Sequence, residues 1–181
     1  MVKVKKAATS GSVPSLDILA AKLRIVEAEL SLEEREVNLD GGGSFMAEPN
    51  LNCKIEVVKN LIDPGVDEGV KFFDRFKLKK DDDGEWAFLK YSKLGNLIRV
   101  RYSEEWFDSD ADFEESDFEG FEFIATVQPK IDSKGKQLKG SVIDWESIRP
   151  AGGADEKEAA GRATMAAAAE KEEEDFKDIP F

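Results

Sequence analysis

Apolar and polar residues alternate along several short stretches of this chain, with the period of two that half-buried β-strands have. The clearest stretch is Leu51–Val58, which would turn one apolar and one polar side to its surroundings. Its apolar side holds Leu51, Cys53, Ile55 and Val57, and its polar side holds Asn52, Lys54 and Glu56. We therefore predict a strand with one face in a core and the other in water.

Four more stretches have strand character. Val70–Leu78, Gly120–Gln128 and Leu138–Ile148 lie between clusters of turn-forming residues, and the last two are joined by the hairpin turn Ser133–Lys136. Lys22–Leu30 fits either a strand or the continuation of a helix that begins nearby, and we favour the strand. The pattern thus gives five strands.

A helical spacing separates the third strand from the fourth. From Trp86 to about Val100, the apolar residues Trp86, Leu89, Leu94, Leu97 and Ile98 would share one face of a helix. A five-stranded antiparallel barrel with a helix between its third and fourth strands is the arrangement of the OB-fold. The predicted fold class is therefore β-rich α+β, with an OB-fold-like barrel. Such barrels bind oligonucleotides on the face of the second and third strands and on nearby loops.

The chain divides into three parts. Residues 1–15 read as a flexible basic arm, and residues 16–150 hold the OB-fold-like domain. Residues 151–181 read as a disordered linker and an acidic tail, with some helix expected over Met165–Lys171. At 181 residues, this is one ordinary domain with tails.

The composition argues against an enzyme. The chain has no histidine, and Cys53 is its only cysteine, so the commonest general acid/base and the usual zinc ligand sets are missing. No glycine-rich phosphate loop or nucleophile elbow occurs either, and we expect no catalysis and no cofactor. The lone cysteine, the lack of an apolar run of about 18 residues and the lack of a secretory leader indicate a cytoplasmic protein outside the membrane.

The formal net charge of −13 is concentrated in two blocks. Residues 103–122 contain ten acidic and no basic residues, and residues 151–181 contain nine acidic and four basic residues. These blocks contribute −10 and −5, which leaves the rest of the chain at +2. The body of the domain can therefore carry a basic face despite the acidic total.

The third strand has the residues that single-stranded DNA requires. Non-specific binding of a single strand needs cations for the phosphates and flat rings on which bases stack. One side of this strand carries one ring and four cations, which suits DNA. The residues of this side are Lys71, Phe73, Arg75, Lys77 and Lys79. The opposite side carries Phe72, Phe76 and Leu78, together with Asp74. If a neighbouring segment covered Phe73, the lysines would form only a solvated edge.

Other cations would extend this surface. Arg24 and Lys54 lie on the strands expected next to the third one. Lys130, Lys134, Lys136 and Lys139 line the last hairpin, where they would clamp a phosphate backbone or form an ordinary solvated turn. The lysines of the N-terminal arm would add non-specific contacts to phosphates. Trp86 and Trp145 have apolar neighbours and are expected in the core.

The C-terminus reads as a hook for another protein. Apolar side chains gain nothing by ending in water, and a proline next to the last ring reduces the entropy lost when a partner grips it. Acidic residues around this tip would steer it toward a basic surface. The residues expected to bind the partner are Asp175, Phe176, Asp178, Ile179, Pro180 and Phe181.

The ending Asp178-Ile179-Pro180-Phe181 resembles the C-terminal tip of bacterial-type single-stranded DNA-binding proteins, including phage-encoded ones, over about a dozen residues. More broadly, the strand Lys71–Phe76 and the following Lys93–Gly95 resemble small phage OB-fold proteins of replication or recombination. The resemblance implies a non-catalytic protein that coats single-stranded DNA. Through its tip it would recruit a polymerase, primase, helicase, nuclease or recombinase in the bacterial host cell. The Ala/Gly-rich linker differs from the Gly/Gln-rich linker of that family, and the oligomeric state, including assembly with further copies of the chain, stays open.

The acidic block 103–122 allows several interpretations. Asp108, Asp110, Asp112, Glu114 and Glu119 have the offsets of a calcium loop, but Phe113 stands where that loop needs glycine. The alternatives are a solvated loop and a surface that repels DNA. Two other functions also compete with DNA binding. One is an acidic mimic of DNA that inhibits a nuclease or DNA-binding protein, and the other is an adaptor that uses only the tail.

Overall fold

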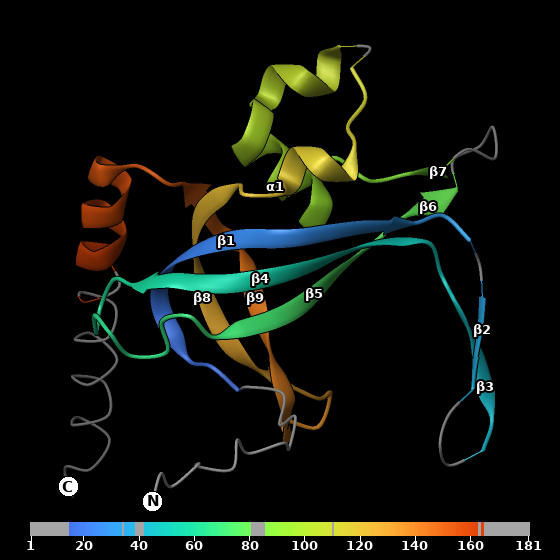
Figure 1. The fold of residues 1–181 in the computed structure, drawn as a ribbon, viewed down its shortest axis with the longest axis horizontal. Coiled ribbons are helices and arrows are strands. Elements are labelled where there is room, and N and C mark those ends of the chain that lie inside the picture. Colours follow the sequence, from blue (N-terminus) through green and yellow to red (C-terminus); the bar gives the residue numbers. More distant parts are fainter. Residues whose placement is uncertain are drawn as a thin grey trace, which may run out of the picture.

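The computed structural model describes residues 15–33, 35–38, 42–80, 86–109, 111–162 and 164. Its centre is a five-stranded antiparallel sheet in the order β5-β4-β1-β8-β9 (Figure 1). The strands are β1 (Ile18–Ser31), β4 (Asn50–Asn60), β5 (Lys71–Lys77), β8 (Glu122–Ile131) and β9 (Gln137–Pro150). Each of the five predicted strands is present, and the stretch at Lys22–Leu30 is a strand rather than a helix.

The sheet buries one face, as the alternation predicts. Leu51, Cys53, Ile55 and Val57 of β4 are fully buried. Phe72 and Phe76 of β5, Leu23 and Ile25 of β1, and Phe123 and Val127 of β8 join the same core. Burial of these side chains stabilises the fold by about 1.5–3 kcal/mol each.

The helix α1 (Lys93–Tyr102) lies over one end of the sheet (Figure 1). In the sequence it stands between β5 and β8, which are the third and fourth strands of this sheet in chain order. It buries Leu94, Leu97 and Ile98, which belong to the predicted apolar face. The prediction that it begins at Trp86 is wrong. Residues Trp86–Ala87 instead form a short strand, β7, with β6 (Lys79–Lys80).

The start of α1 is set by its cap. The Ser92 hydroxyl accepts a hydrogen bond of 3.2 Å from the Gly95 backbone N–H, which satisfies one of the donors left free at a helix N-terminus. Leu89 therefore lies before the helix and is 64% exposed, so it is not part of the predicted buried face. The apolar spacing alone predicts a helix that begins too early, because it takes no account of the capping residue Ser92.

The sheet is open in the described part of the chain. Its edge strands β5 and β9 meet through side chains, without the hydrogen-bonded ladder that would close a barrel. The Phe76 and Trp145 rings pack edge to face, with centroids 4.7 Å apart. Trp145 is buried, as predicted, whereas the Trp86 side chain lies outside the described residues.

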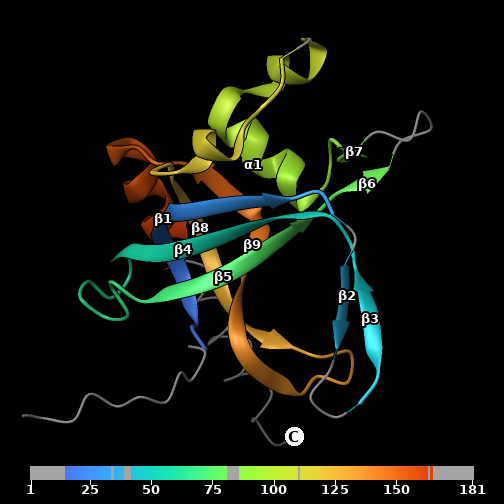
Figure 2. The same ribbon diagram turned by 45° about the vertical axis from the view of Figure 1, so that its right-hand side comes forward.

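A small hairpin not foreseen from the sequence leaves the sheet between β1 and β4. It consists of β2 (Arg35–Asn38) and β3 (Ser44–Ala47), and it projects away from the five-stranded sheet (Figures 1 and 2). The glycine run beside Ser44 predicted only a loop, because strands of four residues are too short for a clear alternation.

The acidic block is largely folded. It contains two 3₁₀ helices, η1 (Glu104–Asp108) and η2 (Glu115–Phe118), in place of the predicted solvated loop. Trp106 stacks on Tyr102 at 5.9 Å, and Phe113 contacts Phe118 edge to face at 5.3 Å. The aromatic residues among the acidic ones hold the segment on the domain. The carboxylates of its described residues lie mostly at the surface.

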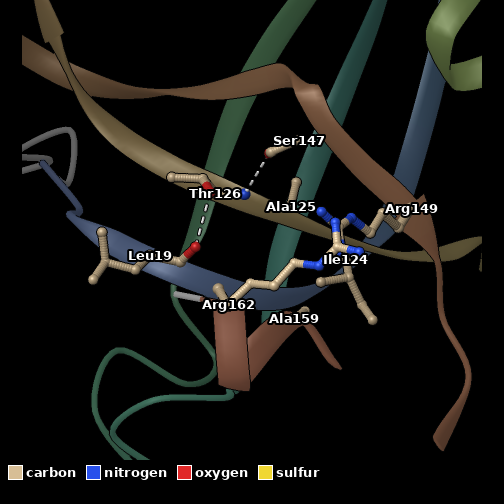
Figure 3. Close-up of a pocket in the computed structure, with 9 residues that line it drawn as sticks. Leu19, Ile124, Ala125, Thr126, Ser147, Arg149, Ala159 and Arg162 are labelled. Atoms are coloured by element: carbon tan, nitrogen blue, oxygen red, sulfur yellow. Dashed lines mark hydrogen bonds between the residues drawn. The ribbon is translucent and has the colours of Figure 1, made fainter. Parts of the chain in front are cut away.

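The described structure continues beyond Pro150, where the sequence placed the start of a disordered linker. Residues 153–162 form a helix that packs on the sheet through Ala159 against Ala20 and Ile124. A hollow of about 220 Å³ lies beneath this helix, with Arg149 and Arg162 among its lining residues (Figure 3). The domain therefore includes at least the first part of the predicted linker.

Candidate nucleic-acid interface

The outer face of β5 combines one exposed ring with several cations. Strict alternation along this edge strand buries Phe72, Asp74 and Phe76 and exposes the residues between them. Phe73 is 69% exposed, the largest exposed fraction of any phenylalanine in the described residues. The prediction that Lys71, Phe73, Arg75, Lys77 and Lys79 face water is confirmed.

Residues of β4 complete the surroundings of the Phe73 ring. Lys54 is its partner across the ladder, and the Lys54 Nζ lies 5.9 Å from the ring centroid. Asn52 pairs with Arg75, and its Oδ1 accepts a 3.1 Å hydrogen bond from the Arg75 Nε. Asn52 was not predicted as a site residue, although its polar position beside Lys54 in the alternation was the available signal.

A groove of about 530 Å³ runs along the open edge between β5 and β9. Phe73 and Arg75 line it from β5, and Lys130 lines it from β8. The structure thus brings together three of the residues predicted to bind DNA, although Lys130 is 55 positions from Arg75 in the sequence. Glu29 also lines the groove and lowers its positive charge.

Several of the predicted cations are neutralised by nearby carboxylates. Lys54 lies 3.3 Å from Glu27, and Lys77 lies 2.8 Å from Glu48. The Lys77 ammonium and its hydrogen bond lower the pKa of the Glu48 carboxyl, with Lys79 adding a smaller effect. Surface pairs of this kind are weak, so a phosphate can replace the carboxylate.

Six of the predicted cations form no ion pair with a carboxylate of the described residues. Such cations are better suited to bind an anion than the paired ones. Two of them, Arg75 and Lys130, line the groove beside Phe73. Lys139 lies in the same hairpin as Lys130 but does not line the groove. The six residues are Arg75, Lys79, Lys130, Lys134, Lys136 and Lys139.

Arg24 belongs to a different arrangement from the one predicted. Its Nε donates a 2.9 Å hydrogen bond to Glu122, and its guanidinium lies 3.8 Å from Glu56. Glu56 also lies 3.8 Å from Lys71, and Glu122 lies 2.9 Å from Lys22. This row of ion pairs crosses four strands, so Arg24 and Lys71 hold the sheet as well as facing solvent.

The same row reaches the C-terminal helix. Glu156 in that helix lies 3.2 Å from Lys22 and 3.5 Å from Lys59. The hydrogen bonds from Arg24 and Lys22 lower the pKa of the Glu122 carboxyl, and the hydrogen bonds to Glu122 and Glu156 raise the pKa of Lys22. The charged residues at this end of the sheet therefore compensate one another and are less suited to bind an anion.

The last hairpin presents its lysines to solvent. The Asp132 Oδ1 accepts hydrogen bonds from the backbone N–H groups of Lys134 and Lys136, at 2.8 and 2.9 Å, and so fixes the turn. All four predicted lysines of this hairpin are exposed, but only Lys130 lines the groove.

The predicted partner-binding tip lies outside the described residues. This applies to Asp175, Phe176, Asp178, Ile179, Pro180 and Phe181, and to the lysines of the N-terminal arm.

The described residues contain no group of three or more His, Cys, Asp and Glu side chains arranged to hold a metal ion. Asp110 of the calcium-loop pattern lies outside them. Within the same residues, no helix has the length and apolar character required to cross a membrane. The chain matched no protein-family model, no curated protein and no solved structure.

Proposed function

We propose that this protein binds single-stranded DNA without catalysing a reaction, through the outer face of β5 and the groove between β5 and β9. The observation that carries the proposal is the exposed ring of Phe73, which lies beside Lys54 and shares a groove with Arg75 and Lys130. A large ring left in water at an edge strand gains nothing for the fold. It is suited to stack on a base, which is worth about 1–3 kcal/mol.

The strand arrangement supports the same proposal. The order β5-β4-β1-β8-β9, with α1 between β5 and β8 in the sequence, matches the strand order of an OB-fold, although no ladder between β5 and β9 closes the sheet in the described residues. The OB-fold is a partly open barrel that binds single strands on its second and third strands and on the loop between its last two. Here these elements are β4, β5 and the hairpin of Lys130. We therefore infer an OB-fold-like barrel.

We further propose that the protein acts in replication or recombination in the cytoplasm of a bacterial host. The acidic tip around Phe181 would recruit a replication or recombination protein while the domain holds the DNA. Deleting residues 172–181 is expected to abolish that recruitment and to leave the affinity for DNA unchanged or raised. A pull-down with and without the tip tests this division. A sharp loss of DNA affinity on the deletion would contradict it.

Fluorescence anisotropy with a labelled 20-mer of oligo-dT at low salt tests DNA binding. The wild-type protein is expected to bind, and Phe73→Ala is expected to weaken binding about tenfold, because one stacked base is lost. Arg75→Gln should weaken binding and reduce the slope of log K against log salt by about 0.7, the value for one phosphate contact on a single strand. Val66→Ala, an exposed apolar residue in the loop before β5, is the control. The proposal fails if the wild-type protein does not bind.

A second candidate function follows from the net charge of −13. The acidic block 103–122 has ten carboxylates in its sequence, and aromatic residues hold its described part on the domain. Such a surface is suited to imitate the phosphates of DNA. An acidic mimic would bind a nuclease or DNA-binding protein and would not bind oligo-dT. The anisotropy titration with oligo-dT therefore separates the two functions.

A further inference from the structure

A second pocket adjoins the Phe73 groove at the other end of β5. It has a volume of about 370 Å³ and lies between the end of β5 and the segment that leads into α1. Phe88, Leu89 and Leu94 supply its apolar part, and Leu89 is 64% exposed to solvent. A pocket of this size falls in the range of ligand pockets, which are mostly apolar with a few polar groups.

The apolar wall of this pocket is held in position. Phe88 stacks on Trp106 at 6.1 Å and contacts Phe113 edge to face at 5.7 Å. Leu94 is buried in α1. The aromatic side chains of the acidic block therefore support the pocket from behind, so its shape does not depend on a ligand.

The rim of the pocket is cationic. Arg75, Lys77, Lys79 and Lys93 all line it. Lys77 lies 2.8 Å from Glu48, and Lys93 lies 3.7 Å from Asp74. In the described part of the chain, neither Arg75 nor Lys79 forms an ion pair, although Lys79 has a weaker electrostatic effect on Glu48. The rim therefore keeps a net positive charge. A ligand suited to this pocket combines an apolar group with a negative charge.

Arg75 lines both this pocket and the Phe73 groove. Residues two apart on a strand are separated by about 7 Å, so the two hollows follow one another closely along β5. A chain bound over Phe73 continues past Arg75 into the pocket. This continuity favours a polymer with repeated rings and charges over an isolated small molecule.

We propose that this pocket is a second nucleotide subsite, which takes a base against Phe88 and Leu89 and the adjoining phosphate on Lys79 and Arg75. The proposal rests on the proposed function, because it extends the path of the same single strand. The strand would run from Lys130, over Phe73, to the pocket in front of α1. Two classes of contact then act together: the rings of Phe73 and Phe88, and the cations Arg75 and Lys79 beside them.

The test separates contact with bases from contact with phosphates. Leu89→Ala and Lys79→Gln are titrated with labelled oligo-dT and with an abasic phosphodiester of the same length. Leu89→Ala is expected to weaken binding of oligo-dT about fivefold and to leave binding of the abasic strand unchanged, because it removes only apolar contact. Lys79→Gln should weaken binding of both strands and lower the salt slope by about 0.7.

Val66→Ala and Lys157→Gln are the matched controls, since both residues are exposed and lie outside the two hollows. Unchanged affinity of Leu89→Ala for oligo-dT would overturn the second subsite, while loss of binding in Phe73→Ala would still support the proposed function. An increase in affinity on Leu89→Ala would mean that a competing segment, such as the acidic C-terminus, occupies the pocket. That result would also overturn the proposal.

Discussion

The indole Nε1 of Trp145 in β9 donates a hydrogen bond of 3.0 Å to Oδ2 of Asp74 in β5. This bond joins the two edge strands of the sheet where no backbone ladder is present. Asp74 is 9% exposed and lies between Phe73 and Arg75 in the sequence. Its Oδ1 also accepts a 2.7 Å hydrogen bond from the Arg75 backbone N–H. The carboxylate beneath the proposed DNA-binding face therefore fixes the edge strand that presents it.

Replacement of Trp145 by Phe is expected to lower the free energy of unfolding by about 1–3 kcal/mol, because a buried carboxylate oxygen loses its donor. The missing ring atoms add a cavity term, so a double-mutant cycle with Asp74→Ala isolates the coupling. We expect the double variant to lose less stability than the sum of the single variants. Urea unfolding measures each value. Additivity within about 0.3–0.5 kcal/mol would show that the bond does not couple the strands.

The alternation of residues was sufficient to predict the sheet and the exposed face of β5. In Lys71–Leu78, each inward residue except Asp74 is apolar and each outward residue except Phe73 is charged, so only one orientation buries the core. The two exceptions are the informative residues. Asp74 can be buried because the indole of Trp145, 71 positions away in the sequence, donates a hydrogen bond to its carboxylate. The alternation of neighbouring residues cannot predict so distant a partner.

The pairing of charges could not be predicted for the same reason. Arg24 has the sequence context of an outward cation on a neighbouring strand, and it is one. Its neutralisation depends on Glu122 across the β1–β8 ladder, where the two residues are register partners. The helix over 153–162 was missed because its main tertiary anchor is the small residue Ala159, which gives little hydrophobic signal.

The ion pairs of Glu122 predict a dependence of stability on pH. Hydrogen bonds from Arg24 and Lys22 hold the pKa of Glu122 below its ordinary value of 4.5. A lowered folded-state pKa contributes stability that is complete above the unfolded value and is lost as the pH falls through the folded value. The wild-type protein should therefore exceed Glu122→Gln in stability at pH 7 and lose that advantage below about pH 4.5.

Urea midpoints of both proteins between pH 7 and pH 3 measure this effect. Glu146→Gln is the control, because Glu146 is exposed and has no ion pair among the described residues. A constant difference between wild type and Glu122→Gln across this range would contradict the assignment.

Cys53 is expected to be chemically silent in the folded protein. Its side chain is fully buried, and this burial, with a smaller effect of Asp74, raises the pKa of the thiol to about 12. The thiolate is the reactive form, so a maleimide at pH 8 should not label the native protein within hours. Complete labelling in urea, followed by mass spectrometry, is the matched measurement. Rapid labelling without denaturant would show that the core of β4 opens.

Gly95 allows α1 to pack against the segment that lines the second pocket. A Cβ atom at this position would lie 2.1 Å from the Lys90 carbonyl oxygen, and backbone atoms cannot move away as a flexible side chain would. Gly95→Ala is therefore expected to destabilise the fold by about 1–3 kcal/mol or more, despite the better helix propensity of alanine. Gly153→Ala, which meets no atom within 4 Å, should be neutral or slightly stabilising. Thermal unfolding of the two variants measures the difference.

The same clash should affect DNA binding. Leu89 and Lys90 must shift to relieve it, so Gly95→Ala should bind oligo-dT more weakly than Gly153→Ala under conditions where both remain folded. Equal affinities of the two variants would show that the packing of α1 does not affect the pocket.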